Sequence, residues 1–119
     1  MRTVEDCLFC SIVAGRIPAD VVVETEHTLA FRDIAPQAPV HVLVVPKDHI
    51  DHAGRIESSD AATLAAMIAT AQQVADLEGI GGEDRGYRLI FNVGPDAQNS
   101  VPHLHLHVVG GRSLTWPPG

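Results

Sequence analysis

The chain has 119 residues, of which 45% are hydrophobic, and its formal net charge at pH 7 is −7. This acidic balance argues against general binding of a nucleic-acid polymer, which needs clustered Lys and Arg against the phosphates. No apolar run reaches the roughly 18 residues of a membrane span, and the N-terminus lacks the apolar region of a secretory signal peptide. We therefore expect one cytoplasmic domain over residues 1–119, without a membrane partner.

The N-terminal half is expected to contain a short helix and three strands. The helix covers residues 7–14, which carry an apolar stripe after Asp6, a good N-cap residue. A loop with two prolines, residues 33–39, is expected to separate the second strand from the third. Runs of β-branched and apolar residues predict the strands at 21–24, 28–32 and 41–46.

The C-terminal half is expected to contain one long helix and two strands. The helix begins at Ser58 or Ser59 and runs to about Glu78, because apolar residues recur there at helical spacing. The strands are expected at 87–92 and 102–109. Most connections between strands are too short for parallel crossovers. The sequence thus predicts an α+β fold, with an antiparallel sheet of about five strands, one long helix against one face and a short N-terminal helix.

Three histidines alternate with apolar residues within residues 102–109. Because strand side chains alternate between faces, His103, His105 and His107 would share one face, about 6.5–7 Å apart. The apolar residues between them would share the opposite, buried face. The pattern indicates either a metal site, since imidazole is a common ligand, or a nucleophilic histidine oriented by its neighbours.

The middle histidine is the best nucleophile candidate. A neutral imidazole is a good nucleophile near pH 7 and a good leaving group once it carries a phosphoryl group. His105 is flanked by imidazoles that can donate to phosphate oxygens, and the hydroxyl of Ser100 enters the same strand and can protonate a leaving group. An acidic chain can still hold one or two phosphates through backbone N–H groups, hydroxyls and imidazoles.

The only two cysteines, Cys7 and Cys10, form a C-x-x-C pair. A disulfide across so short a loop would stabilise little. A thioredoxin-like redox pair normally follows a strand, and none is expected before Cys7. A half-site for zinc fits better, and it needs two more ligands from elsewhere in the chain. His49 and His52 lie in a loop, where functional residues concentrate.

The histidine strand and several other segments together resemble one known family. Residues 103–109 fit the H-φ-H-φ-H-φ-φ signature (φ, apolar) of the histidine triad superfamily. The further blocks of that family are matched in order by residues 33–39, 45–50, 92–94 and 100–103. The ending, residues 110–112 and 116–119, resembles the HINT branch, the histidine triad nucleotide-binding proteins. The resemblance covers nearly the whole chain, from Cys7 to Gly119.

This resemblance implies hydrolysis of purine nucleoside phosphoramidates, typically adenosine 5′-phosphoramidates, with release of the nucleoside monophosphate. His105 would attack the α-phosphorus and become nucleotidylated. His107 and His49 would support the phosphate and the nucleophile, and Ser100 would lie near the leaving amine. No cofactor is required for this chemistry.

The same resemblance implies a binding site for an AMP-like purine nucleotide. Asp33 would bind the ribose hydroxyls. The phosphate side would be held by Asn92, Asn99 and the backbone at Ser100 and Val101. The apolar slot for the base would consist of Phe9, Ile12, Ile17, Phe31, Ile34 and Leu43.

Two departures from the family pattern concern this site. Gln98 and Asn99 stand where the family has a glycine–glutamine pair, and losing that glycine can alter the loop conformation. Pro102 replaces an aromatic residue of the HINT branch. Both departures are expected to affect leaving-group preference and rate more than the type of reaction.

The resemblance also implies a homodimer whose sheet continues across a two-fold axis, with the tail through Trp116 reaching toward the partner's site. Some bacterial-type members bind a structural zinc ion through a C-x-x-C pair and two histidines, which here would be Cys7, Cys10, His49 and His103. The alternative is that both cysteines are small buried residues beside the base slot. Two other functions stay open: a nucleotide-binding adaptor with incidental hydrolysis, and a metallohydrolase that uses the three alternating histidines as ligands.

Overall fold

The computed structural model describes residues 1–119. In chain order its elements are helix α1 (Leu8–Val13), strands β1 (Val21–Glu24), β2 (Thr28–Arg32) and β3 (Val40–Pro46), helix α2 (Ala61–Leu77), and strands β4 (Tyr87–Ile90) and β5 (Leu106–Gly110). Three short 3₁₀ turns, η1 (Ala53–Arg55), η2 (Ser58–Asp60) and η3 (Pro95–Ala97), lie in the connections. None of the helices combines the length and the apolar character that crossing a membrane requires.

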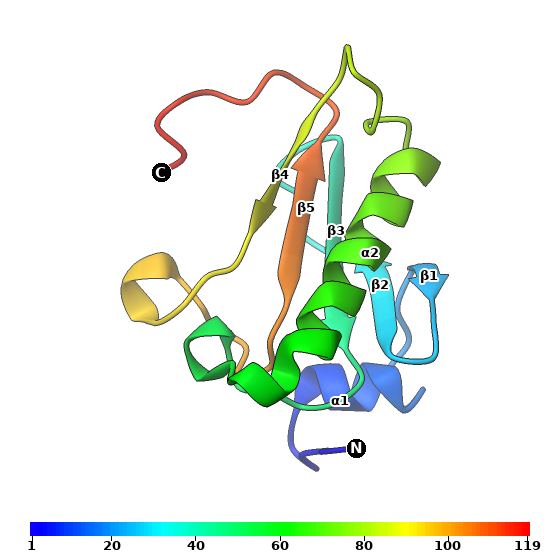
Figure 1. The fold of residues 1–119 in the computed structure, drawn as a ribbon, viewed down its shortest axis with the longest axis vertical. Coiled ribbons are helices and arrows are strands. Elements are labelled where there is room, and N and C mark those ends of the chain that lie inside the picture. Colours follow the sequence, from blue (N-terminus) through cyan, green and yellow to red (C-terminus); the bar gives the residue numbers. More distant parts are fainter.

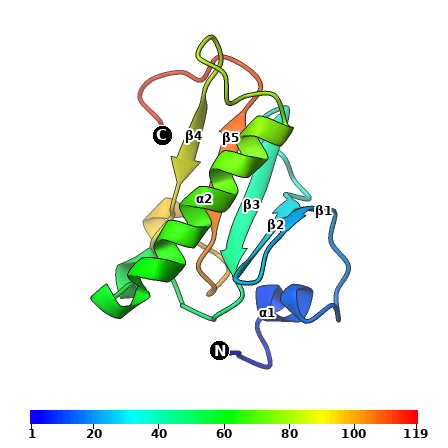
Figure 2. The same cartoon turned by 45° about the vertical axis from the view of Figure 1, so that its right-hand side comes forward.

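The strands form one antiparallel sheet in the order β1-β2-β3-β5-β4, and α2 lies across one of its faces (Figure 1, Figure 2). Every residue of β3 is buried. Because strand side chains alternate, Val42 and Val44 join the core beneath α2, whereas Leu43 and Val45 pack with residues of α1. The α+β class and the five-stranded antiparallel sheet predicted from the sequence are confirmed.

The histidine strand begins later than expected. β5 starts at Leu106 rather than at residue 102, because the preceding residues do not join the ladder. Pro102 has no N–H to donate, and the N–H of Leu104 donates to the carbonyl of Ile50 at 2.6 Å. The first two histidines therefore lie before the strand, and only the third belongs to it.

Other element ends differ from the prediction by a few residues. Helix α1 is capped by Cys7, whose Sγ accepts the N–H of Cys10 at 3.3 Å, rather than by Asp6. Helix α2 begins at Ala61 because the preceding residues, Ser58–Asp60, form a 3₁₀ turn closed by a capping box. Strand β4 ends two residues earlier than expected.

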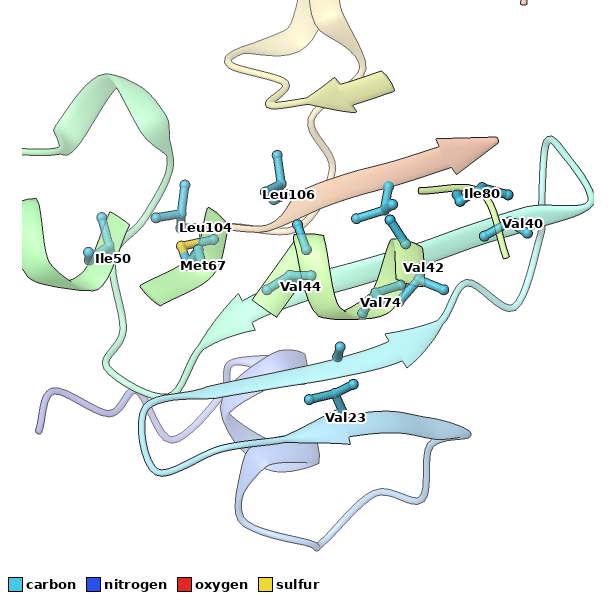
Figure 3. Packing of buried hydrophobic residues seen from close by; sticks show 14 residues of the cluster. Val23, Val40, Val42, Val44, Ile50, Met67, Val74, Ile80, Leu104 and Leu106 are labelled. Carbon is cyan, nitrogen blue, oxygen red and sulfur yellow. The ribbon is translucent and has the colours of Figure 1, made fainter. Parts of the chain in front are cut away.

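The main hydrophobic core lies between α2 and the sheet (Figure 3). Met67, Ala71 and Val74 of α2 are fully buried. Their partners in the core, from alternate positions of β3 and β5, are Val42, Val44, Leu106 and Val108. The apolar positions of the predicted long helix thus supply its buried face, although Leu77 at its end is 61% exposed.

Met67→Ala should lower the free energy of unfolding by about 2–4 kcal/mol, because it removes a fully buried side chain from between helix and sheet. Leu77→Ala on the same helix is the matched control. Its side chain is largely exposed, so the loss should stay below about 1 kcal/mol. Chemical denaturation followed by circular dichroism compares the two variants. Equal losses would contradict the core described above.

Candidate active site and metal centre

A row of paired residues crosses the sheet on the face opposite α2. The strand register aligns Phe31 of β2 with Leu43 of β3, Leu43 with His107 of β5, and His107 with Ile90 of β4. This face is therefore apolar at β2 and β3 and carries an imidazole at β5. A cavity of about 400 Å³ is lined by the first three of these residues.

The cavity brings together twelve of the residues predicted for the nucleotide site: Phe9, Ile12, Ile17, Phe31, Asp33, Ile34, Leu43, Asn92, Ser100, Val101, His105 and His107. Asn99 and His49 do not line it. The side-chain oxygen of Asn99 is buried and has no hydrogen-bond partner. Four lining residues were not predicted: Leu8, Pro18, Arg32 and Gln98. All four adjoin predicted residues in the sequence, and Gln98 is also one of the departures from the family pattern noted above.

His105 presents one free ring nitrogen. Its Nδ1 lies 2.7 Å from the backbone carbonyl of His103. A carbonyl only accepts hydrogen bonds, so Nδ1 carries the proton and Nε2 of the neutral ring keeps its lone pair. The edge-to-face contact with Phe9, with ring centroids 5.2 Å apart, further restricts the ring. This is the arrangement that a nucleophilic imidazole requires.

His107 is oriented by His41, a residue that the sequence indicated only as part of a strand. The backbone N–H of Gln37 donates to Nδ1 of His41 at 3.0 Å, so the proton of the neutral His41 ring is on Nε2. That Nε2 lies 2.8 Å from Nδ1 of His107 and donates to it. The remaining proton of His107 is therefore on its own Nε2. The side-chain nitrogen of Asn92, 3.4 Å away, is also a donor, so the two N–H groups do not bond to each other and both can donate to a ligand. The bonds from Gln37 through His41 to His107 thus fix one tautomer of His107.

Burial keeps His107 neutral at pH 7. Removal from water, with smaller contributions from the neighbouring His105 and His41, lowers the pKa of His107 from 6.5 to about 4. At neutral pH the His107 ring therefore carries a single proton, and this proton is on Nε2 because Nδ1 accepts the hydrogen bond from His41. This N–H can donate to an anionic oxygen in the cavity without adding a buried charge to the empty site.

A metal ion bound by all three alternating histidines disagrees with the structure. Nδ1 of His103 faces the two cysteines, Nδ1 of His105 faces a backbone carbonyl, and Nδ1 of His107 faces His41. Asp33, His41 and His107 do have candidate ligand atoms within 4.8 Å of one another. In this structure, however, Nε2 of His41 donates to Nδ1 of His107 at 2.8 Å, so these two nitrogens already satisfy each other.

Cys7, Cys10, His49 and His103 form a separate, fully buried cluster. Sγ of Cys7 lies 3.2 Å from Nδ1 of His103, and Sγ of Cys10 lies 3.3 Å from Nδ1 of His49. The two Nδ1 atoms are 3.1 Å apart. A tetrahedral zinc ion with two sulfur and two nitrogen ligands requires ligand separations of roughly 3.3–3.6 Å for its N–N and N–S pairs. The donor set fits structural zinc, and binding the ion requires the ligand atoms to move apart by only a few tenths of an ångström.

The outer nitrogens of the cluster support the same conclusion. Nε2 of His103 lies 2.9 Å from the carbonyl of Pro46, and Nε2 of His49 lies 2.9 Å from the carboxylate of Asp51. Both acceptors place the ring proton on Nε2 and leave Nδ1 free as a ligand. Burial lowers the pKa of His103 to about 4 and raises the pKa of the Cys10 thiol. A bound cation would favour the thiolate that burial alone disfavours.

This placement corrects the role expected for His49. Neither of its ring nitrogens faces the cavity, because one faces the cysteines and the other Asp51. His49 therefore belongs to the metal cluster, and His41 occupies the supporting position beside His107.

The N-terminal segment holds the cluster in place. The carbonyl of Arg2 accepts the N–H of His49 at 2.7 Å, and the N–H of Val4 donates to Sγ of Cys10 at 3.5 Å. The Arg2 guanidinium pairs with Asp48 at 2.7 Å and with Asp60 at 2.9 Å. The contact with Arg2 lowers the pKa of Asp48, whereas the pKa of Asp60 is lowered first by the hydrogen bond from the N–H of Glu57 and then by Arg2. The ion pair with Asp48 ties the segment to the loop that carries His49.

Zinc should be present in the purified protein at about one ion per chain, measured by elemental analysis. Chelation should lower the melting temperature by roughly 10 °C, because the ion binds only the folded cluster. Cys10→Ala should remove both the zinc and the response to chelator. His27→Ala, which removes a 71% exposed imidazole, is the control and should retain both. A wild-type protein without zinc, whose melting temperature does not rise on adding it, would contradict the assignment.

Stability should fall as pH decreases from about 6.5 toward 4. The folded-state pKa of His107 is lowered, so the unfolded chain binds the extra proton first, and the contribution present above pH 6.5 is lost across this window. His107→Asn should reduce the pH dependence of the unfolding free energy in urea titrations at pH 7.5 and pH 5, whereas His27→Asn should preserve it. If the unfolding free energy of His107→Asn depended on pH as strongly as that of the wild type, the lowered pKa of His107 would be contradicted.

Comparison with known proteins agrees with the fold and the site. Residues 14–114 match the HIT domain family. An uncharacterized HIT-like protein of Synechococcus elongatus is 46% identical over 115 residues, covering 97% of this chain and 98% of that protein. The 14 kDa zinc-binding protein of Brassica juncea is 42% identical over 116 residues, covering 96% and 100%. The crystal structure of a HIT family hydrolase from Legionella pneumophila has a TM-score of 0.91 and 49% identity, covering 96% and 100%. The chain belongs to the HIT family.

Proposed function

We propose that this protein hydrolyses purine nucleoside phosphoramidates through a nucleotidyl-histidine intermediate, as a member of the HINT branch. The observation that carries the proposal is the 2.7 Å contact between Nδ1 of His105 and the His103 carbonyl, which leaves Nε2 unprotonated. The name of the Legionella pneumophila relative, a HIT family hydrolase, is consistent with hydrolysis.

In the first chemical step, Nε2 of His105 forms a bond to the α-phosphorus and the phosphorus–nitrogen bond of the substrate breaks. The leaving amine takes the electron pair and a proton. Ser100 is exposed at the cavity and can pass that proton from solvent. The Nε2–H of His107 donates to a phosphate oxygen as negative charge develops there.

In the second step, water attacks the phosphorus and the bond to Nε2 of His105 breaks. The electron pair returns to the imidazole, a water proton goes to solvent, and the nucleoside monophosphate leaves. The His103 carbonyl stabilises the nucleotidylated, cationic ring, because it accepts a hydrogen bond from Nδ1–H. The chemistry needs no bound metal in the cavity, and zinc at the cysteine cluster has a structural role.

The cavity suits an AMP-like ligand. The aromatic and aliphatic side chains on α1, β2 and β3 can stack on a purine, and the cavity volume matches a small-molecule site. One carboxylate oxygen of Asp33 accepts the N–H of Ala35 at 2.8 Å, and the other is available for a ribose hydroxyl. Asn92 and the backbone at Ser100 and Val101 would contact the phosphate. Asn99 would join them only after turning its buried oxygen toward the ligand.

The homodimer and the cytoplasmic location belong to the same proposal. Strand β4 pairs with β5 alone, so its other edge is available to a second copy, and Leu89 on it is 37% exposed. The tail is similarly available, since Trp116 is 81% exposed. Two free thiols suit a reducing compartment.

His105→Ala should abolish turnover of adenosine 5′-phosphoramidate, with a loss of at least about 10³-fold in kcat. AMP binding measured by calorimetry should remain, because the rest of the cavity is unchanged. His27→Ala serves as the control and should keep the wild-type rate. Mass spectrometry of quenched wild-type reactions should detect an adenylyl group on His105. Wild-type turnover by His105→Ala would disprove the mechanism.

The same measurements separate the enzyme from a nucleotide-binding adaptor. Tight AMP binding together with a negligible wild-type kcat/KM on all phosphoramidates would favour the adaptor. Activity that persists in EDTA would support catalysis without a metal in the cavity.

A further inference from the structure

Gln98 has a backbone conformation that a glycine would adopt more easily. Its φ is +59° and its ψ is 35°, and it is the only non-glycine residue of the chain with a positive φ. A side chain strains this left-handed region, whereas glycine enters it freely. Gln98 also stands where the family pattern has glycine. The chain therefore keeps a long polar side chain at a position where its removal would relax the backbone.

Gln98 is one of the residues that line the cavity, and its side-chain amide is not used by the fold. The N–H of Gln98 donates to the carbonyl of Pro95 at 3.0 Å and closes the turn η3. The side-chain amide has no hydrogen bond to the rest of the chain, and Ser100 lines the same cavity. Both its donor and its acceptor are therefore available to a ligand.

The strand order decides which part of a ligand meets this amide. Most of the apolar lining comes from α1, β2, β3 and the loops that follow α1 and β2. Gln98 belongs instead to the segment that joins β4 to β5, which supplies a single apolar lining residue, Val101, and β4 lies on the side of β5 away from β3. A nucleotide with its base in the apolar part and its α-phosphorus at His105 would direct the other phosphorus substituent away from the base. That substituent is the leaving amine, and Ser100 and Gln98 lie on the segment it approaches.

We propose that Gln98 selects leaving amines that carry a hydrogen-bond-accepting oxygen, such as the carboxylate of an amino acid, by donating its side-chain N–H to that oxygen. This inference rests on the proposed phosphoramidate hydrolysis and adds its leaving-group specificity. A site built to hydrogen-bond a substrate group discriminates against the analogue that lacks it.

The test uses two adenosine 5′-phosphoramidates of similar shape. In one the leaving amine is glycine, which carries a carboxylate, and in the other it is isobutylamine, which is apolar. The measured quantity is the ratio of their kcat/KM values in the same preparation. Gln98→Gly should lower this ratio about tenfold, the effect of losing one hydrogen bond to a charged group. Gln98→Glu should lower it further, because its carboxylate repels that of the substrate.

Two controls separate specificity from folding and from overall charge. Gln72→Glu adds the same charge on an exposed position of α2, across the sheet from the cavity, and should leave the ratio within twofold of wild type. The melting temperature of Gln98→Gly should equal or exceed that of wild type, because the strained backbone is relieved. If Gln98→Gly lowered kcat/KM equally for both substrates, or left both values unchanged, the ratio would stay the same. That result would overturn the inference while the proposed hydrolysis stands. A wild-type protein that hydrolyses neither substrate would overturn both.

Discussion

The pairing of β3 with β5 is the constraint on which the catalytic site depends. It sets Leu43 opposite His107 and His41 opposite Val109, so the two histidines are diagonal neighbours on one face. Long side chains can meet across such a diagonal, and here Nε2 of His41 reaches Nδ1 of His107. A slip of one residue would turn His107 toward α2. The burial pattern of β5 opposes that slip, because Leu106 and Val108, both fully buried beneath α2, would then leave the core.

The site also depends on residues before β5 that do not pair in the sheet. The segment before β5 does not pair with β3, and its backbone is satisfied by Ile50 instead. This departure allows successive histidines to face different partners: His103 turns into the cysteine cluster, His105 toward the cavity, and His107 toward His41. Three chemically identical side chains thereby acquire three different hydrogen-bonding environments and, for the two most buried, a lowered pKa.

The sequence predicted the class of fold and the order of the elements, because those depend on local spacing and apolar patterning. Most of the cavity lining and the four members of the cysteine cluster were predicted only through the family resemblance. The role of His41 depended on the register between two strands that are distant in sequence, which spacing alone does not determine. His49 was expected both in the metal set and beside the nucleophile, and the sequence could not separate the two roles because a loop histidine carries no sign of which cluster its ring will join. The late start of β5 follows from one tertiary hydrogen bond of Leu104. The strain at Gln98 had one sequence signal, the family glycine that this residue replaces.

His103 contributes its side chain to the cysteine cluster and its backbone to the orientation of the nucleophile His105. Its imidazole faces the cysteines, whereas its backbone carbonyl accepts a hydrogen bond from the Nδ1–H of His105. The carbonyl is common to all amino acids, so the nucleophile does not depend on the identity of the side chain at this position. Metal retention and nucleophile orientation are therefore separable traits in evolution. A lineage could lose its cysteines and replace the first histidine of the motif while the second kept its working tautomer, provided that the backbone path through this residue was preserved.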